Sequence, residues 1–358
     1  MTAQGSLDTR PAEGSHRFER AATASRQRTS LLPAVTRTGS FRRMTTVALP
    51  TRSRGSASSS VPIDLALLLM VGIWAVNFTV AKLALGVLSP LAFNALRFPL
   101  AAAVVFLALR VRGALSLPAP EHRLRIVVLG LTGNFLYQQF FIFGLDRTRA
   151  GTASLLLAAT PILTALLSAS VGHERVGWRA WLGACATLGG MVLVMGSAAN
   201  GETSLIGDIL MILASFSWAV YTVGSRPLVE RYGALAVTAW TLGVGTIGVA
   251  LVGLPDLART DLGALSPGAW LSVVYAGAMS IGVAYLIWYS GVGRIGNTRT
   301  AVYSNLVPVL AIAVAWLWLR ETPSVLQLLG ALVIIGGVSL AQSRREGRRS
   351  VLQAGARS

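Results

Sequence analysis

The chain has 358 residues, of which 53% are hydrophobic and 13% are charged, whereas soluble domains carry roughly 25% charged residues. This composition excludes an ordinary soluble domain and indicates a protein embedded in lipid. The net charge is +17, but ten of the 31 basic residues lie in the first 54 positions and five follow Gln342. The charge therefore belongs to the tails and does not predict a nucleic-acid partner. The single cysteine, Cys185, excludes an intrachain disulfide.

The N-terminal tail, residues 1–61, is rich in Arg, Ser, Thr and Gly and has too few large apolar side chains to fold. We expect it to be disordered and basic. The tail lacks the apolar core of a secretory signal, and its composition has some likeness to an organelle transit peptide. Met44 is an alternative start of the protein. Residues 343–358 form a second basic tail. Both tails are expected to bind anionic lipids at the membrane surface.

Ten apolar segments lie between the tails, and each has about the 20 residues that a helix needs to cross a bilayer. They are residues 63–85, 89–110, 123–145, 150–171, 178–197, 205–225, 234–254, 268–289, 297–319 and 324–342. The pattern predicts an all-α polytopic membrane protein with ten transmembrane helices.

The apolar part of the chain is duplicated. Residues 144–193 align without a gap on residues 291–340, and an upstream match follows at an offset of 144. The matched polar, proline and glycine positions include Asp64/Asp208, Trp74/Trp218, Lys82/Arg226, Arg147/Arg294, Pro161/Pro308, Glu174/Glu321, Gly183/Gly330 and Gly189-Gly190/Gly336-Gly337. We assign the repeats to residues 62–198 and 199–342. Each has five helices, an odd number, so the second repeat is expected to be inverted in the membrane.

The orientation follows from the arginines in the short links between helices. With the N-terminus in the cytoplasm, the inside links hold ten arginines and the outside links hold four. Positive residues concentrate in cytoplasmic loops. We therefore expect a multi-pass protein of the cell membrane with both termini in the cytoplasm.

The chain resembles the EamA-type transporters of the drug/metabolite transporter superfamily. The likeness covers residues 62–342 and is carried by Trp74-x-x-Asn77-Phe78 and Lys82, by Pro90 and Arg97, and by the duplicated unit of a proline-containing helix, a glutamate and a glycine-rich helix. The resemblance implies a ten-helix bundle around a central cavity that moves small metabolites, often amino acids or related compounds, commonly outward. One departure is that residues 234–254 lack a counterpart of Arg97.

Polar and aromatic side chains inside the spans are the candidates for substrate binding, because an unpaired polar group in hydrocarbon is costly. They are Trp74, Asn77, Arg97, Asn134, Tyr137, Gln138, Trp218, Tyr221, Tyr285, Tyr303 and Asn305. The asparagines, glutamine and tyrosines could instead join helices to one another. Arg97 could bind a substrate carboxylate or a helix C-terminus.

Three ionisable residues near the span ends are expected to have structural roles. Lys82 should extend to the interface. Glu174 and Glu321 oppose the local helix dipole, so each should have a partner, such as Arg175, Arg320 or a neighbouring helix end.

These features predict a secondary transporter that exports a small metabolite by alternating access to a central cavity. A signalling or scaffold protein that acts through its basic tails is the alternative. A membrane-embedded enzyme would need an acid/base pair or a metal cluster, and no Asp, Glu or His lies near the middle of a predicted span. No catalytic residue, cofactor or metal is therefore expected.

Overall fold

The computed structural model describes residues 61–113, 117–172, 177–196 and 204–355, and these ranges contain helices and no strand. The elements are α1 (Val61–Leu85), α2 (Pro90–Val111), α3 (Pro120–Gly130), η1 (Leu131–Leu136), α4 (Tyr137–Arg147), α5 (Ala150–Leu157), α6 (Thr160–Ser170), α7 (Trp178–Gly196), α8 (Leu205–Tyr232), α9 (Ala234–Arg259), η3 (Leu262–Ala264), α10 (Pro267–Val274), η4 (Tyr275–Val283), α11 (Ala284–Ile295), α12 (Asn297–Ser304), α13 (Val307–Leu319) and α14 (Val325–Gly355). Segments η1 and η4 are π-helical, and η3 is a short 3-10 turn.

Nine helical runs in the described ranges are long and apolar enough to cross a membrane, and the apolar stretch Val325–Ala341 of α14 is a shorter tenth. Some runs combine elements: the third contains α3, η1 and α4, and the eighth contains α10, η4 and α11. The fourth divides into α5 and α6 next to Pro161, and the ninth into α12 and α13 next to Pro308. Proline lacks the N–H that continues a helix, so both repeats break at the same place. The predicted all-α fold with ten transmembrane helices is confirmed.

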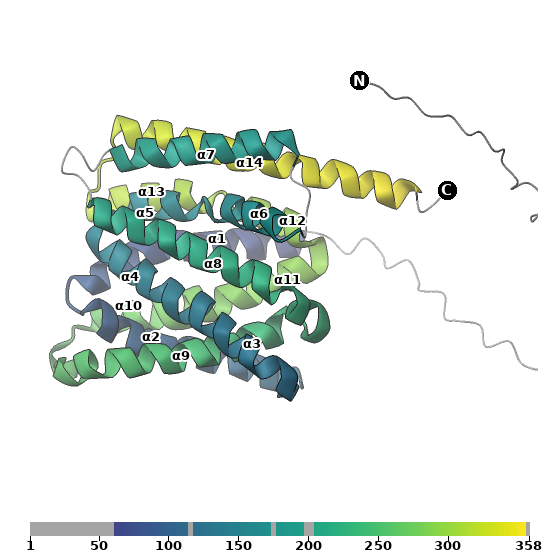
Figure 1. The fold of residues 1–358 in the computed structure, drawn as a ribbon. Coiled ribbons are helices and arrows are strands. Elements are labelled where there is room, and N and C mark those ends of the chain that lie inside the picture. Colours follow the sequence, from purple (N-terminus) through teal and green to yellow (C-terminus); the bar gives the residue numbers. More distant parts are fainter. Residues whose placement is uncertain (1–60, 114–116, 173–176, 197–203, 356–358) are drawn as a thin grey trace, which may run out of the picture. The chain divides into compact units, whose positions relative to one another are not determined.

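Helices α7 and α14, which end the two repeats, pack along one another (Figure 1). A Cβ atom added at Gly190 would lie 3.0 Å from the carbonyl oxygen of Gly330, and one added at Gly330 would lie 2.8 Å from that of Gly190. Gly183 and Gly337 make the equivalent contact further along the pair. Rising numbers in α7 thus meet falling numbers in α14. The two equivalent helices are antiparallel, which confirms the predicted inversion of the repeats.

A second pair of equivalent helices, α2 and α9, packs together on the other side of the bundle (Figure 1). Each also packs on the π-helical segment of the opposite repeat, α2 on η4 and α9 on η1. Glycines allow the close approach: Gly277 lies against the backbone oxygen of Arg97, and Gly245 lies against Asn134. These contacts fix the depth of both polar residues in the bundle.

The two repeats differ in how tightly their fourth helices are packed. Every residue from Ala150 to Leu156 in α5 is buried, and α5 packs against α13. In the equivalent segment α12, Thr300 is the single buried residue among the described side chains, and Val302 is 47% exposed. Segments α6 and α12 have no contact comparable to that of α5 and α13. We therefore call the end of the bundle with α5 and α13 the closed end, and the end with α6 and α12 the open end.

Candidate substrate-binding site

Five aromatic side chains from both repeats form a connected group, which we call the ring cluster: Trp74, Tyr137, Trp218, Tyr285 and Trp288. The ring of Trp74 in α1 lies 5.7 Å from Trp288 and 6.4 Å from Tyr285, both in α11. The ring of Trp218 in α8 lies 6.1 Å from Tyr285 and 5.0 Å from Tyr137 in α4. All five side chains are only half-buried. The cluster thus keeps accessible aromatic surface within the spans, as a site for a small ligand requires.

The indole of Trp74 is held by the opposite repeat, because its Nε1 donates to the backbone oxygen of Ser280 at 3.0 Å. Ser280 belongs to η4, and a π-helical turn frees carbonyls from the regular helical ladder. Shifted by the repeat offset of 147, η1 falls on residues 278–283 within η4. Both repeats therefore have a π-helical segment at the equivalent position. It ends two residues before Gln138 in the first repeat and two residues before Tyr285 in the second.

Arg97 of α2 is 1% exposed. Its Nε donates to Asn94 Oδ1 at 2.9 Å, and its Nη2 donates to Gln138 Oε1 at 2.8 Å. The guanidinium carbon also lies 5.7 Å from the ring centroid of Phe141, which stacks on Tyr137. Both hydrogen-bond partners are neutral amides, so they orient the guanidinium without offsetting its charge.

The polar residues of the third span have different neighbours. Gln138 bonds Arg97, and Tyr137 joins the ring cluster, whereas Asn134 packs against Gly245 of α9. Asn134 lies in η1, and a π-helical turn changes the angular position of residues four apart.

Several polar atoms close to these helices are buried without a hydrogen-bond partner in the described structure. They are Asn77 Oδ1, Thr79 Oγ1, Asn134 Nδ2 and both amide atoms of Gln139. Asn77, a predicted site residue, lies in α1 less than one helical turn beyond Trp74 and is 7% exposed. A buried polar atom without a partner is costly, so a ligand that reached Asn77 would gain a hydrogen bond there.

The remaining predicted residues lie at or beyond the edge of the ring cluster. The ring of Tyr221 lies 5.1 Å from Trp218, and its hydroxyl pairs with Thr241 Oγ1 at 3.2 Å. Tyr303 donates to Asp64 Oδ1 at 2.8 Å and so joins α12 to α1. Asn305 follows α12 at the break before α13.

Two aromatic residues of α11 were missed by the sequence analysis. The ring of Trp288 contacts that of Trp74 at a tilt of 39°, and the Tyr289 hydroxyl forms a hydrogen bond with the Thr238 hydroxyl of α9. Both follow Tyr285 by three or four residues, which is the spacing of one helical face. That spacing was the signal that could have found them.

The closed end is held by two charged side chains that bind helix termini. Lys82 Nζ donates to the carbonyl oxygens of Leu145, Asp146 and Thr148 at 2.7, 2.8 and 2.8 Å, at the C-terminus of α4. The ammonium of partly buried Lys82 is thus bound at the end of the span by a helix terminus. Cations are favourable at a helix C-terminus because they complement its dipole.

Glu321 binds the beginning of α5. Its two carboxylate oxygens accept hydrogen bonds from the backbone N–H groups of Ala150 and Gly151 at 3.2 and 3.3 Å. Of the partners considered for this glutamate, the neighbouring helix end is the one observed. Its repeat equivalent, Glu174, lies outside the described residues.

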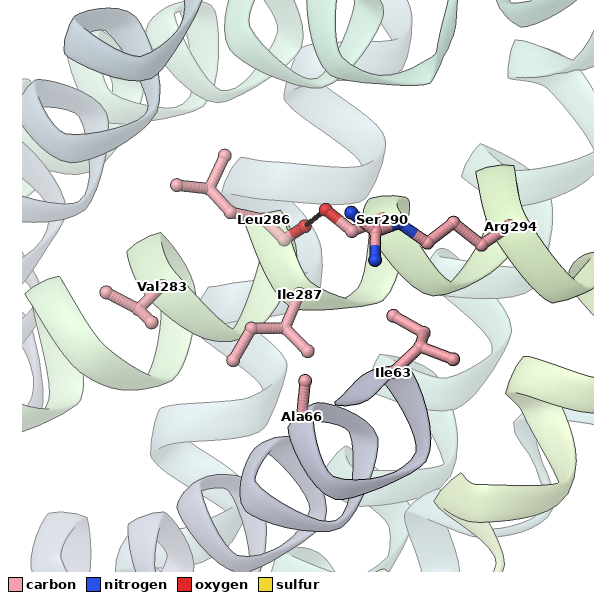
Figure 2. Close-up of a pocket in the computed structure, with 7 residues that line it drawn as sticks. All are labelled: Ile63, Ala66, Val283, Leu286, Ile287, Ser290 and Arg294. Atoms are coloured by element: carbon pink, nitrogen blue, oxygen red, sulfur yellow. Dashed lines mark hydrogen bonds between the residues drawn. The ribbon is translucent and has the colours of Figure 1, made fainter. Parts of the chain in front are cut away.

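A cavity of about 230 Å³ lies between α1 and α11. Figure 2 shows Arg294 at one end of it and Val283 at the other, with mainly aliphatic side chains between them. Its lining residues are Ile63, Ala66, Val283, Leu286, Ile287, Ser290 and Arg294. The Ser290 hydroxyl donates to the backbone oxygen of Leu286 in the same helix at 2.8 Å. The wall of the cavity therefore offers few polar groups to a ligand.

In the described ranges, nine long apolar helical runs and a shorter tenth, arranged as two inverted repeats, form a polytopic membrane protein with the architecture of inverted-repeat transporters. The sequence model of the EamA-like transporter family matches residues 61–196 and again 205–342. The chain belongs to this family, as the sequence resemblance indicated, and it is a small-molecule transporter, not an enzyme.

Three similar proteins have names that describe transport. The uncharacterized transporter YdfC of Bacillus subtilis is 32% identical over 75% of this chain and 87% of its own length. A probable terminal-alkyne amino-acid exporter of Streptantibioticus cattleyicolor is 31% identical over 79% of this chain and 94% of its length. A probable amino-acid metabolite efflux pump of Escherichia coli is 30% identical over 76% of this chain and 91% of its own length.

A solved structure, titled only as the crystal structure of a protein, superposes with a TM-score of 0.58 at 24% identity and covers 78% of this chain and 98% of its own. This likeness supports the fold alone.

Proposed function

We propose that the protein is a secondary transporter that moves a small metabolite, an amino acid or related compound, outward across the cell membrane by alternating access to the ring cluster. One observation carries the proposal: both repeats contribute to the ring cluster. Trp74 and Trp218 are repeat equivalents, and both contact Tyr285. A site shared by two inverted repeats can be exposed by each of them in turn. The names of two relatives, a probable exporter and a probable efflux pump, agree with outward movement.

The unequal packing of the repeats supports alternation. Residues 150–156 of α5 are buried at the closed end, whereas the equivalent segment α12 is largely half-exposed at the open end. Inverted repeats of a transporter can exchange two such arrangements. In the proposed orientation, with both termini in the cytoplasm, the open end faces the cytoplasm and corresponds to an inward-facing state.

Exchange of the arrangements gives a role to Arg226, the repeat equivalent of Lys82. In this structure Arg226 Nε donates to Glu230 Oε1 at 3.0 Å, and both side chains are exposed. When the open end closes, we expect Arg226 to leave this weak pair and to bind the last carbonyls of α11, as Lys82 binds those of α4.

The proposal is tested with purified protein in proteoliposomes that contain a bacterial metabolite extract, with efflux followed by mass spectrometry. Trp74→Leu and Trp218→Leu should each slow the flux of the transported solutes at least tenfold, while the yield of folded protein stays the same. Trp316→Leu is the matched control, since Trp316 is 53% exposed on α13. Wild-type protein that moves no solute would refute the transport proposal, and full flux in both site variants would refute the placement of the site.

A further inference from the structure

We infer that the ring cluster binds an organic monoanion, a carboxylate carried on an aromatic or other apolar body, in preference to a zwitterion or a cation. This inference rests on the proposed transport function and narrows its substrate class, from amino acids and related compounds to the related compounds that carry a carboxylate but no ammonium group. Three features of the described residues support it: a buried charge without a counter-ion, hydroxyl groups without hydrogen-bond partners in the same group of rings, and neutral side chains as the unpartnered acceptors.

The buried charge belongs to Arg97. Its guanidinium is enclosed by aromatic rings, at 4.9 Å from the ring centroid of Phe93, 5.8 Å from that of Phe98 and 5.7 Å from that of Phe141. None of the ion pairs between described residues includes Arg97. An unpaired charge within a membrane span is expensive, and such charges commonly serve a pathway or a ligand. A monoanion would neutralise this one.

Donors without hydrogen-bond partners belong to the same group of side chains. Among the described residues, no hydrogen bond involves the hydroxyls of Tyr137 and Tyr285 or the Nη1 of Arg97. The ring of Phe141 contacts both the guanidinium of Arg97 and the ring of Tyr137. The two tyrosines come from opposite repeats, and both rings contact Trp218. A carboxylate accepts several hydrogen bonds and donates none, so it matches this set of donors.

The same geometry is unfavourable for an added ammonium group. The unpartnered acceptors among the described residues, Asn77 Oδ1, Thr79 Oγ1 and Gln139 Oε1, are neutral. A zwitterion beside Arg97 therefore leaves one net positive charge in the site, and a cation leaves two. The faces of Trp74 and Trp218 attract cations only weakly compared with a carboxylate, so they would serve better as stacking surfaces for the apolar body.

The test uses four ligands with one carbon skeleton: 3-phenylpropionate, phenylalanine, phenethylamine and 3-phenylpropanol. Binding to the full-length protein in lipid nanodiscs is followed by tryptophan fluorescence, excited at a wavelength where these phenyl groups do not absorb. We expect 3-phenylpropionate to bind at least tenfold more tightly than the other three. Tyr137→Phe and Tyr285→Phe, which remove only a hydroxyl, should each reduce that preference about tenfold, since a hydrogen bond to a charged group is worth about 1.5–3 kcal/mol.

Tyr232→Phe is the matched control, because its hydroxyl pairs with His122 Nδ1 at 3.0 Å outside the ring cluster. It should leave the preference unchanged. Equal or tighter binding of phenylalanine would overturn the inference, and so would binding of none of the four ligands or a preference that survives both site variants. The metabolite efflux assay is independent of this series. If the protein transports solutes in the efflux assay but any of these contrary binding results is found, the transport proposal still holds and only the inferred substrate class is refuted.

Discussion

Trp74 and Trp218 are equivalent residues of the two inverted repeats, and both rings contact the same side chain, Tyr285, at centroid distances of 6.4 and 6.1 Å. A pair of equivalent residues that meets at one point lies on or near the axis that relates the repeats. Tyr285 has no aromatic equivalent in the first repeat, where Gln138 occupies its position and bonds Arg97. The site is thus built on a symmetric frame, but its chemistry is asymmetric.

The α7–α14 contact should be sensitive to single methyl groups. A Cβ atom at Gly337 would lie 2.7 Å from the carbonyl oxygen of Gly183, whereas one at Gly336 would meet no atom within 4 Å. We expect Gly337→Ala to lower the Tm by several degrees, since overpacking costs about 1–3 kcal/mol. Gly336→Ala should leave the Tm unchanged or raise it, because alanine is the better helix former. Thermal unfolding of both variants in one detergent compares them, and equal Tm values would contradict the packing described above.

Lys82 should keep the closed end shut. We expect Lys82→Met to weaken the hold on the C-terminus of α4 and to open this end more often, because three carbonyls lose a charged donor. The measurement is maleimide labelling of Ser154→Cys in a Cys185→Ser background, since Ser154 is 2% exposed. Labelling should become about tenfold faster, in line with the loss of about 1.5 kcal/mol for hydrogen bonds to a charged group. An unchanged labelling rate would show that Lys82 does not hold this end.

Glu321 should act on the same end through α5. Glu321→Gln removes the negative charge at the N-terminus of α5 but retains an acceptor, so its effect should be smaller, about 0.3–1 kcal/mol. The variant should label at Ser154→Cys faster than wild type and more slowly than Lys82→Met. A larger effect than that of Lys82→Met would mean that the carboxylate does more than stabilise the helix terminus.

Arg226 should behave differently from Lys82, although the two are equivalent in sequence. Exposed ion pairs contribute about 0–1 kcal/mol, so Arg226→Met should leave the Tm of the present state unchanged. If Arg226 binds the end of α11 in the opposite state, the variant should nevertheless slow efflux from proteoliposomes several-fold. Arg231→Met, which changes another arginine near the end of α8, is the control. Unaltered efflux in Arg226→Met would remove this role.

Gln138→Glu would place a carboxylate beside Arg97, where the glutamine oxygen now accepts at 2.8 Å. The new ion pair should neutralise the guanidinium of Arg97 and occupy its hydrogen-bond donors. We therefore expect a higher Tm and loss of the preference for 3-phenylpropionate. Fluorescence titration and the Tm of the same sample report both effects. Retained binding of the anion would show that the charge of Arg97 does not select the ligand.

The sequence predicted the parts of this fold that depend on local pattern and repetition. Segment length and composition predicted the helices, and the antiparallel arrangement of α7 and α14 agrees with the predicted inversion. The partners of charged and polar side chains could not be obtained in this way. Lys82 and Glu321 bind termini of helices far away in the chain, and those partners depend on packing.

The π-helical segments are a second feature that the sequence did not reveal. Asn134 lies in η1 and packs against Gly245 of α9, a contact that depends on tertiary packing. The unequal burial of α5 and α12 was not predicted from the repeat, although their sequences differ: α5 reads AGTASLLL and is apolar, whereas α12 reads NTRTAVYS and is mostly polar.

Alternating access is tested most directly by electron–electron distance measurements on two spin-label pairs in the Cys185→Ser background. One pair, Ser170→Cys with Arg299→Cys, reports the open end, and the other, Val87→Cys with Thr322→Cys, reports the closed end; all four positions are exposed. On addition of a transported solute, the first distance should shorten in part of the molecules and the second should lengthen in the same fraction. Distances that stay unchanged, or that change at one end only, would contradict alternating access.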